Sequence, residues 1–227
     1  MSATARQALG RAAALPGAAR ASVNGALRRI PVWPVYAMGA VPPAWLYWQG
    51  LTGGLGVDPV KVIEHRMGLW ALWLLIAGLA VTPLQRFVGL RLIRFRRAIG
   101  LVAFFFVLVH LLTWLVLDVQ ILSQVWADIV KRPYITIGMA AFLLMIPLAA
   151  TSNDWSVRRL GRRWRQLHRL TYAVAILGGV HFVMLAKGWQ LEPLLYLGAI
   201  VGLVGLRLVP SRRNRGNESP GRSGKRT

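Results

Sequence analysis

The residues of this chain best suited to chemistry are four histidines, His65, His110, His168 and His181. Cysteine is absent, which excludes disulfides, thiolate metal sites, iron–sulfur clusters and cysteine nucleophiles. The sequence also offers no pair of acids within an apolar segment. Because imidazole is a common ligand of transition metals and of haem iron, the histidines direct the search toward a metal or cofactor site.

His110 lies in the apolar run AFFFVLVHLLTWLVL, twelve residues after Ala98. On a helix this places it about 18 Å from the start of the run. One interpretation is a neutral core histidine that bonds a facing carbonyl or hydroxyl group. An unsatisfied polar group inside a membrane costs several kcal/mol, however, and this favours a metal or cofactor ligand.

His168 and His181 are 13 residues apart, which is about 19.5 Å of helix rise. His181 should therefore match the depth of His110, and the two could provide both axial ligands of a b-type haem. An ideal helix would set His168 and His181 about 140° apart, so their helix must tilt, bulge or rotate. Gly178 and Gly179 are candidates for a bulge, unless they only allow a close helix contact.

His168 lies among basic residues that include Arg165 and Arg169. One interpretation is a cluster of arginines that extend to the membrane surface. The other is a cofactor site at the cytoplasmic side, where His168 is an imidazole ligand and the arginines bind haem propionates or a flavin phosphate. A second haem there would need a ligand other than histidine, because position 97 is Arg97.

His65 stands between Glu64 and Arg66 at the outer end of an apolar segment. It could be a salt-bridged histidine at the membrane surface, a cofactor contact, or a docking residue for an external partner. The sequence leaves these three readings open.

The composition identifies the elements that must position the histidines. Hydrophobic residues make up 56% of the 227 residues and charged residues 15%, against about 25% charged in soluble domains. Six apolar segments are long enough to cross a bilayer, at 32–50, 67–84, 98–117, 134–150, 170–187 and 191–209. We therefore expect an all-α integral membrane protein in which six transmembrane helices form a haem-binding bundle. The amphipathic segment 118–132 is expected in the membrane interface.

The charges predict how the bundle is oriented. Of the 28 Lys and Arg residues, 23 lie in four segments that share one side of the membrane, and five lie on the other. By the positive-inside rule the arginine-rich side is cytoplasmic and holds both termini. Membrane orientation thus accounts for the net charge of +21, so the charge gives little support for nucleic-acid binding.

Three regions are expected: a basic cytoplasmic arm at 1–30, a transmembrane domain at 31–209 and a basic cytoplasmic tail at 210–227. The arm lacks the apolar core of a signal peptide, and it could rest on anionic lipid.

Three stretches resemble one protein family: GLGVDPVKVIEHRMG (54–68), KRPYITIGMA (131–140) and LGRRWRQLHRLTYAVAILGGVHF (160–182). They are similar to the MsrQ (YedZ) family, the haem-binding membrane subunits of protein-methionine-sulfoxide reductase systems, within the ferric-reductase-like transmembrane group. The resemblance covers residues 31–209, and the last stretch is its most specific part.

The resemblance implies b-type haem on His110, His168 and His181, together with flavin mononucleotide (FMN). It implies an electron-transfer subunit in the bacterial inner membrane that takes electrons from the quinone pool. The acceptor would be a periplasmic, molybdopterin-containing subunit that repairs oxidised methionines and carries the catalysis. Relatives in the wider group carry two histidines on each of two helices, so Arg97 departs from that pattern.

Other functions are compatible with the same residues. The chain could be a cytochrome b that reduces quinones or metals with another acceptor. It could also be a proton-coupled transporter or a structural assembly factor, although the acids are expected at or beyond the ends of the spans, which does not favour transport. No Gly-rich dinucleotide fingerprint is present, so oxidation of a nicotinamide within this chain is not expected.

Overall fold

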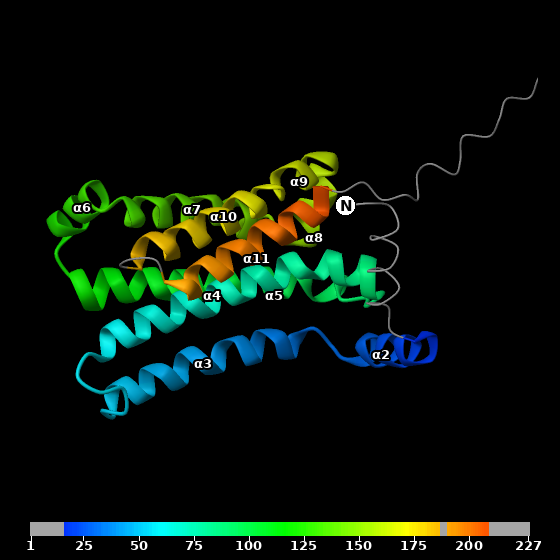
Figure 1. Ribbon diagram of the computed structural model, residues 1–227, viewed down its shortest axis with the longest axis horizontal. Helices are drawn as coiled ribbons and strands as arrows, with labels where there is room; N and C mark the ends of the chain where they lie inside the picture. The colour runs from blue at the N-terminus through cyan, green and yellow to red at the C-terminus, as the bar shows by residue number, and fades with distance from the viewer. Residues whose placement is uncertain (1–15, 187–189, 209–227) are drawn as a thin grey trace, which may run out of the picture.

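The computed structural model describes residues 16–186 and 190–208, and in these ranges every regular element is a helix (Figure 1). Four stretches are long and apolar enough to cross a bilayer: Pro59–Val88, Ile93–Val119, Pro133–Ala150 and Arg162–Leu185. The prediction of an all-α protein with apolar helices of membrane-spanning length is thus confirmed.

Four helices form the centre of the molecule: α4 (Pro59–Pro83), α5 (Arg96–Leu112), α7 (Pro133–Ala150) and α10 (Leu170–Leu185). The most extensive contacts join α4 to α5 and α7 to α10, and α5 also packs on α7. Buried Ala103, Met145 and Val174 lie together where α5, α7 and α10 meet. The centre is therefore two helix pairs held together mainly by apolar side chains.

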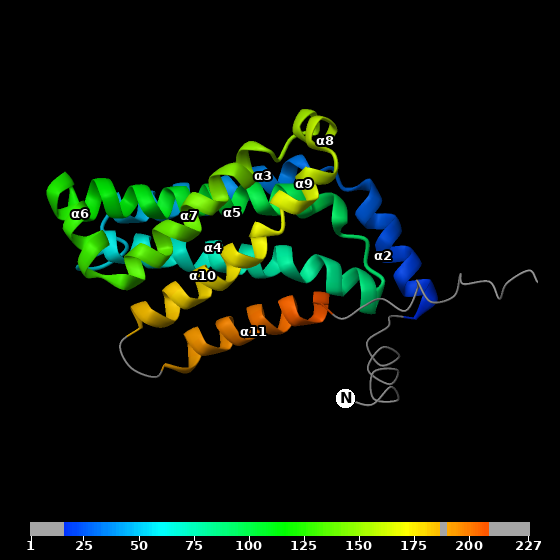
Figure 2. The same cartoon turned by 90° about the horizontal axis from the view of Figure 1, so that it is seen from above.

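Two further helices flank this centre, the earlier one in the sequence clearest in Figure 1 and the later one in Figure 2. Helix α3 (Trp33–Leu51) packs on α4 and α5, and α11 (Leu191–Leu208) packs on α4 and α10. Small residues allow these close approaches: a Cβ added to Gly39 would lie 2.5 Å from Val102 Cγ1, and one added to Gly179 would lie 3.0 Å from Leu197 Cδ1. Of the two roles considered for Gly179, a close helix contact is the one observed.

Helix α4 begins earlier than the predicted segment 67–84, and this prediction of the boundary was wrong. The charged residues Lys61, Glu64 and Arg66 lower the hydropathy of its first turns. The start nevertheless follows ordinary capping rules, because the Asp58 side chain accepts a hydrogen bond from the Lys61 N–H (3.1 Å) and Pro59 occupies the first helical position. His65 therefore lies within a helix.

The segment that carries His168 and His181 is not one ideal helix. Helix α9 (Arg162–Leu167) ends at Leu167, and α10 begins at Leu170 after a turn at His168 and Arg169. In this turn some backbone hydrogen bonds run to the third residue back, so the regular step of an α-helix, and with it the expected offset of 140°, does not apply. The change of geometry occurs here and not at Gly178, where α10 is continuous.

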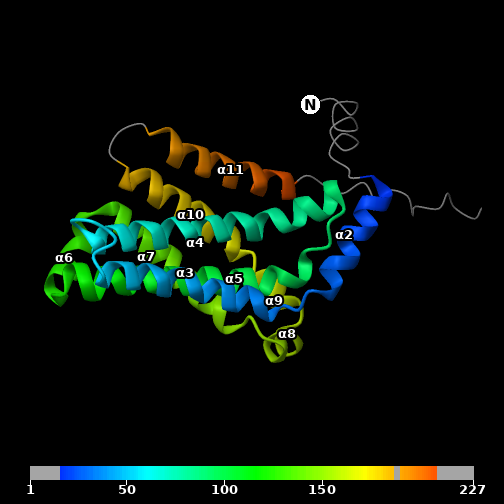
Figure 3. The ribbon, with the colours of Figure 1, turned by 90° about the horizontal axis from the view of Figure 1, so that it is seen from below.

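The two ends of the bundle differ in composition. Helix α6 (Leu122–Lys131) lies at one end, and α2 (Gly17–Arg29), α8 (Asp154–Leu160) and α9 lie at the other (Figures 1 and 3). The α6 helix confirms a helical element within 118–132, and it exposes Leu122, Trp126 and Val130. The second end, here called the arginine-rich end, carries the described arginines of the α2, 84–97 and 154–169 segments.

Part of the expected N-terminal arm is a docked helix. The Asn24 side chain donates to Gly89 O (3.0 Å) and accepts from the Arg91 N–H (2.9 Å). Arg94 donates to the carbonyl groups of Leu27 and Arg28 (3.2 and 2.6 Å). Helix α2 is thus attached to the segment that connects α4 and α5, while residues 1–15 lie outside the described part of the chain.

We expect Gly39→Ala to destabilise the protein by about 1–3 kcal/mol, because its Cβ would overlap Val102 in the contact between α3 and α5. The matched control is Gly100→Ala in α5, where an added Cβ meets nothing within 4 Å. Higher helix propensity alone should leave the control unchanged or slightly more stable. Thermal unfolding of both purified variants measures the difference, and equal stability would contradict the packing argument.

Candidate cofactor site

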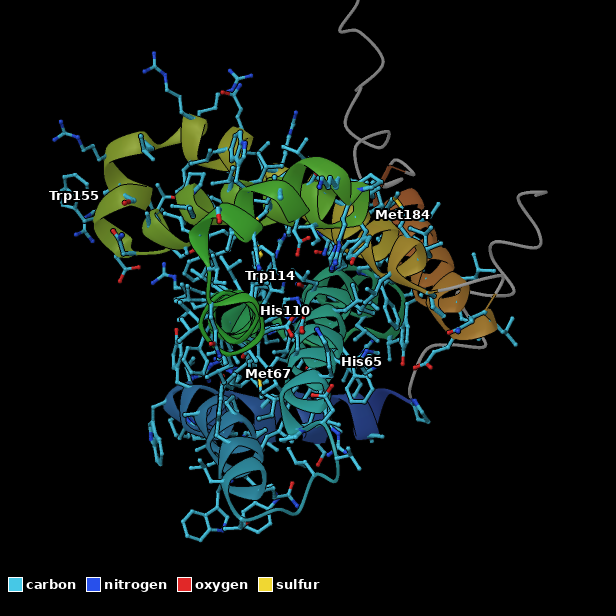
Figure 4. The ribbon with its side chains drawn as sticks, turned by 90° about the vertical axis from the view of Figure 1, so that its left-hand side faces the viewer. His65, Met67, His110, Trp114, Trp155 and Met184 are labelled. Carbon is cyan, nitrogen blue, oxygen red and sulfur yellow. The ribbon has the colours of Figure 1, made fainter. Side chains whose placement is uncertain are left out.

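A cavity of about 610 Å³ lies between α4, α5, α7 and α10. Its volume is within the usual range of about 300–1,000 Å³ for cofactor and ligand sites. Apolar side chains form most of its wall, and three of the four histidines, His65, His110 and His181, also line it. Figure 4 views the molecule from the α6 end and shows His110 near the centre of the bundle.

His110 and His181 are held in the same way. His110 Nδ1 lies 2.8 Å from the carbonyl oxygen of Glu64, and His181 Nδ1 lies 2.7 Å from that of Tyr134. A carbonyl oxygen can only accept, so each Nδ1 must carry the proton. Each Nε2 is then left with a lone pair, which is the form in which imidazole binds a metal.

The two imidazole rings lie edge to face at a distance that is compatible with a shared metal. Their centroids are 6.3 Å apart and their planes are inclined by 83°. A transition metal lies about 2.0 Å from an imidazole nitrogen and the ring centre is about 1.2 Å further back, so two opposed ligands have centroids about 6.4 Å apart. The spacing therefore fits one metal between the two rings, within an apolar cavity of suitable size for a haem.

Two glycines make this arrangement possible. A Cβ added to Gly138 would lie 2.8 Å from His181 Nδ1, and one added to Gly68 would lie 3.2 Å from His110 Cε1. Gly138 is four residues after Tyr134, and Gly68 is four residues after Glu64. Each histidine thus lies across a glycine and donates to the carbonyl group one helical turn earlier. We call Gly68 and Gly138 the glycine seats.

Charged residues line the same cavity near the α6 end. Lys61 Nζ lies 2.6 Å from Asp118 Oδ2 and 3.5 Å from Glu64 Oε2. Glu64 is inside the candidate span Pro59–Val88, so the expectation that every acid lies at or beyond the span ends was wrong. The early start of α4 is the reason for this difference.

His65 lines the cavity, with its ring centroid 5.9 Å from that of Phe182 on α10. The ion pair of Glu64 is made with Lys61, so the reading of His65 as a salt-bridged residue beside Glu64 is not what the structure presents. Of the three readings, a contact with the cavity's occupant has direct geometric support.

His168 does not join the other histidines. Its ring stacks on Trp164 at a centroid distance of 3.9 Å, and its Nε2 lies 3.1 Å from Thr151 Oγ1. Arg165 and Arg169 are exposed beside it at the arginine-rich end. All four histidines lie in the described part of the chain, and none of the other three shares a described contact with His168.

Arg97, which stands where a partner histidine would be needed, forms an ion pair instead. Its Nη2 donates to Asp154 Oδ1 at 2.7 Å, and this hydrogen bond holds the pKa of the Asp154 carboxyl below its ordinary value. The pair joins the start of α5 to the start of α8. No histidine ligand is thus supplied at this position.

Comparisons with known proteins are consistent with this geometry. Residues 67–179 match the family profile for the ferric reductase like transmembrane component. The chain is 49% identical to the haem-binding subunit MsrQ of the protein-methionine-sulfoxide reductase of Brucella anthropi, over 81% of this chain and 84% of that protein. The MsrQ subunit of Agrobacterium fabrum is 50% identical over 78% of this chain and 83% of its own length.

No solved structure is significantly similar to the chain. The identity to MsrQ subunits extends well beyond the 67–179 segment and includes most of the described helices. The chain belongs to the MsrQ family of haem-binding subunits of protein-methionine-sulfoxide reductases.

Proposed function

We propose that this chain is a membrane electron-transfer subunit in which His110 and His181 would hold a b-type haem. The observation that carries the proposal is the pair of imidazoles 6.3 Å apart, each with Nδ1 on a helix carbonyl group. Held by these two imidazoles, the haem would supply transfer of single electrons and not oxygen chemistry.

Different residues of the chain would position the two imidazoles, fix their tautomer and form the wall around the haem. The glycine seats keep both rings in place, and the carbonyl groups of Glu64 and Tyr134 fix the tautomer. The mostly apolar wall, which includes Phe182 beside His65, would limit the access of water to the haem. Each of these contributions comes from packed helices and does not need a loop to close.

We further propose six spans with both termini in the cytoplasm of a bacterium, in its inner membrane. Helices α3 and α11 would be the two spans beyond the four long apolar stretches, since both lie along the central bundle. The described arginines at one end of the molecule support this orientation by the positive-inside rule. Segments 1–30 and 210–227 would then be cytoplasmic, and the α6 end would face the periplasm.

Electrons would enter at the arginine-rich end and leave at the α6 end. The proposed donor is the quinone pool, with FMN as a second cofactor near His168, where Arg165 and Arg169 are exposed for its phosphate. The acceptor would be a periplasmic molybdopterin-containing reductase that repairs methionine sulfoxide in proteins. The present chain would supply electrons to that catalytic subunit.

One observation favours a second candidate. Glu64 and Asp118 line the same cavity as three histidines, and such a set could relay protons in a transporter. The two candidates differ in a simple property, because a proton relay needs no haem. A purified chain without a reduced-minus-oxidised haem spectrum would favour the relay and contradict the electron-transfer proposal.

Substitution of the histidines tests the ligand assignment. We expect His110→Ala and His181→Ala each to remove the same low-spin spectral component, because both rings would bind one iron. His168→Ala should remove a different component or change only the kinetics of reduction. Low-temperature absorption spectra and haem content of the purified variants provide the measurement.

Two results would contradict this assignment. One is a full haem content and an unchanged low-spin spectrum in His110→Ala. The other is the loss of one common component in His110→Ala and His168→Ala, which would pair the wrong histidines.

Gly138→Ala should lower haem affinity about 10–100-fold, because its Cβ would displace the His181 ring from Tyr134 O. Gly68→Ala should have a smaller effect, since its contact of 3.2 Å is less severe. Gly198→Ala in α11, with nothing within 4 Å, is the control. Electron paramagnetic resonance of the low-spin iron reports ring orientation independently of stability, and unchanged signals in Gly138→Ala would refute the role of the seat.

Reporter fusions test the orientation. A reporter that is active only in the periplasm should be active after Gly54 and inactive after Arg213, because the positive-inside rule assigns these points to opposite sides. A cytoplasmic reporter at the same two points should give the reverse pattern. Periplasmic activity after Arg213 would reverse the sides assigned to both ends of the bundle.

A further inference from the structure

A second cavity, of about 280 Å³, lies at the arginine-rich end, away from the histidines. It is formed where α4 ends, α5 and α10 begin and α11 ends. Three arginines, Arg86, Arg96 and Arg207, line it together with Tyr172. No acidic residue is among the described side chains that line it.

Arg207 is held in this cavity by a carbonyl group of α4 that has lost its helical hydrogen bond. Pro83 has no N–H, so the carbonyl group of Leu79 loses its normal helical partner. Arg207 Nη2 replaces that partner, at 2.5 Å from Leu79 O and 3.2 Å from Gly78 O. Its Nη1 donates to the Tyr172 hydroxyl at 3.3 Å. The guanidinium is therefore held rigidly, unlike a surface arginine that moves freely in water.

One donor of this fixed guanidinium has no acceptor. Arg207 Nε is buried and makes no hydrogen bond within the described part of the chain. A buried donor without a partner is unfavourable, and more so when the group is charged. Among the described residues, the wall of the cavity thus offers Arg207 no acceptor that carries negative charge.

A second arginine, Arg96, makes an anion beside Arg207 still more favourable. Arg96, the first residue of α5, lies beside both Arg207 and Tyr172. The two guanidinium groups repel each other, and the positive end of the α5 dipole adds to the same field. Asp154, an acid at the same end of the bundle, is paired with Arg97 instead. An anion between the arginines would remove the repulsion.

We propose that this cavity binds a phosphate group, supplied by the headgroup of an anionic membrane lipid or by a soluble phosphate compound. Guanidinium groups bind phosphate oxygens through paired charge-assisted hydrogen bonds, and the N-terminus of a helix favours the same anion. The cavity opens at the end of the bundle where lipid headgroups and cytoplasmic solutes would both be present. The proposal does not depend on haem binding by the histidines.

The experiment uses the purified full-length protein and two probes. Inorganic phosphate is titrated in detergent while thermal unfolding is followed. Retention of phosphatidylglycerol against phosphatidylcholine is counted separately by native mass spectrometry. We expect a saturable response to at least one probe, weakened about tenfold in Arg96→Gln, which removes one charged contact. Arg163→Gln, an exposed arginine at the same end that does not line the cavity, is the matched control.

The outcomes separate the sources and decide the proposal. A response to inorganic phosphate indicates a soluble phosphate ligand, and a response to phosphatidylglycerol alone indicates a lipid headgroup. Arg207→Lys, which keeps the charge, covers the case in which Arg96→Gln does not fold. No saturable response to either probe, or an equal loss in Arg163→Gln, would overturn the proposal.

Discussion

The structure depends above all on one interaction, the hydrogen bond from an imidazole Nδ1 to a helix carbonyl group. It is made twice, by His110 to Glu64 and by His181 to Tyr134. In an apolar interior such a bond cannot be replaced by water, so losing it would leave a buried donor at a penalty of about 1–3 kcal/mol. Because the acceptor belongs to a packed helix, the position of each ring is set by helix packing and not by side-chain rotamers alone.

This dependence explains why the core is organised as two helix pairs. Helix α4 holds the histidine of α5, and α7 holds the histidine of α10, each beside a glycine seat. The distance between the rings is then fixed by the contact of α5 with α7 and α10, where Ala103, Met145 and Val174 are buried. A rigid separation favours electron transfer, which needs little rearrangement of the ligands. The apolar core between the pairs thus contributes to function through geometry.

Sequence reasoning predicted the helical class and the approach of His110 to His181, because helix rise determines depth along a span. It placed the start of α4 too late, since hydropathy decreases at Lys61 and Glu64, although the Asp58–Pro59 cap was a readable signal. The glycine seats could not be recognised. Glycine is common in membrane helices, and only the facing ring of a distant helix distinguishes Gly68 and Gly138 from other glycines.

The turn at His168 and Arg169 affects how the two ends of the molecule relate. In a continuous helix, the direction of His168 would dictate the direction of His181. The turn interrupts this relation. His168 stacks on Trp164 among the arginines, and the direction of His181 into the cavity does not depend on it. The two environments can therefore differ in charge and polarity within one segment. The proposed transfer of electrons from one end of the molecule to the other would use this difference, because a donor and an acceptor would impose different demands on each end.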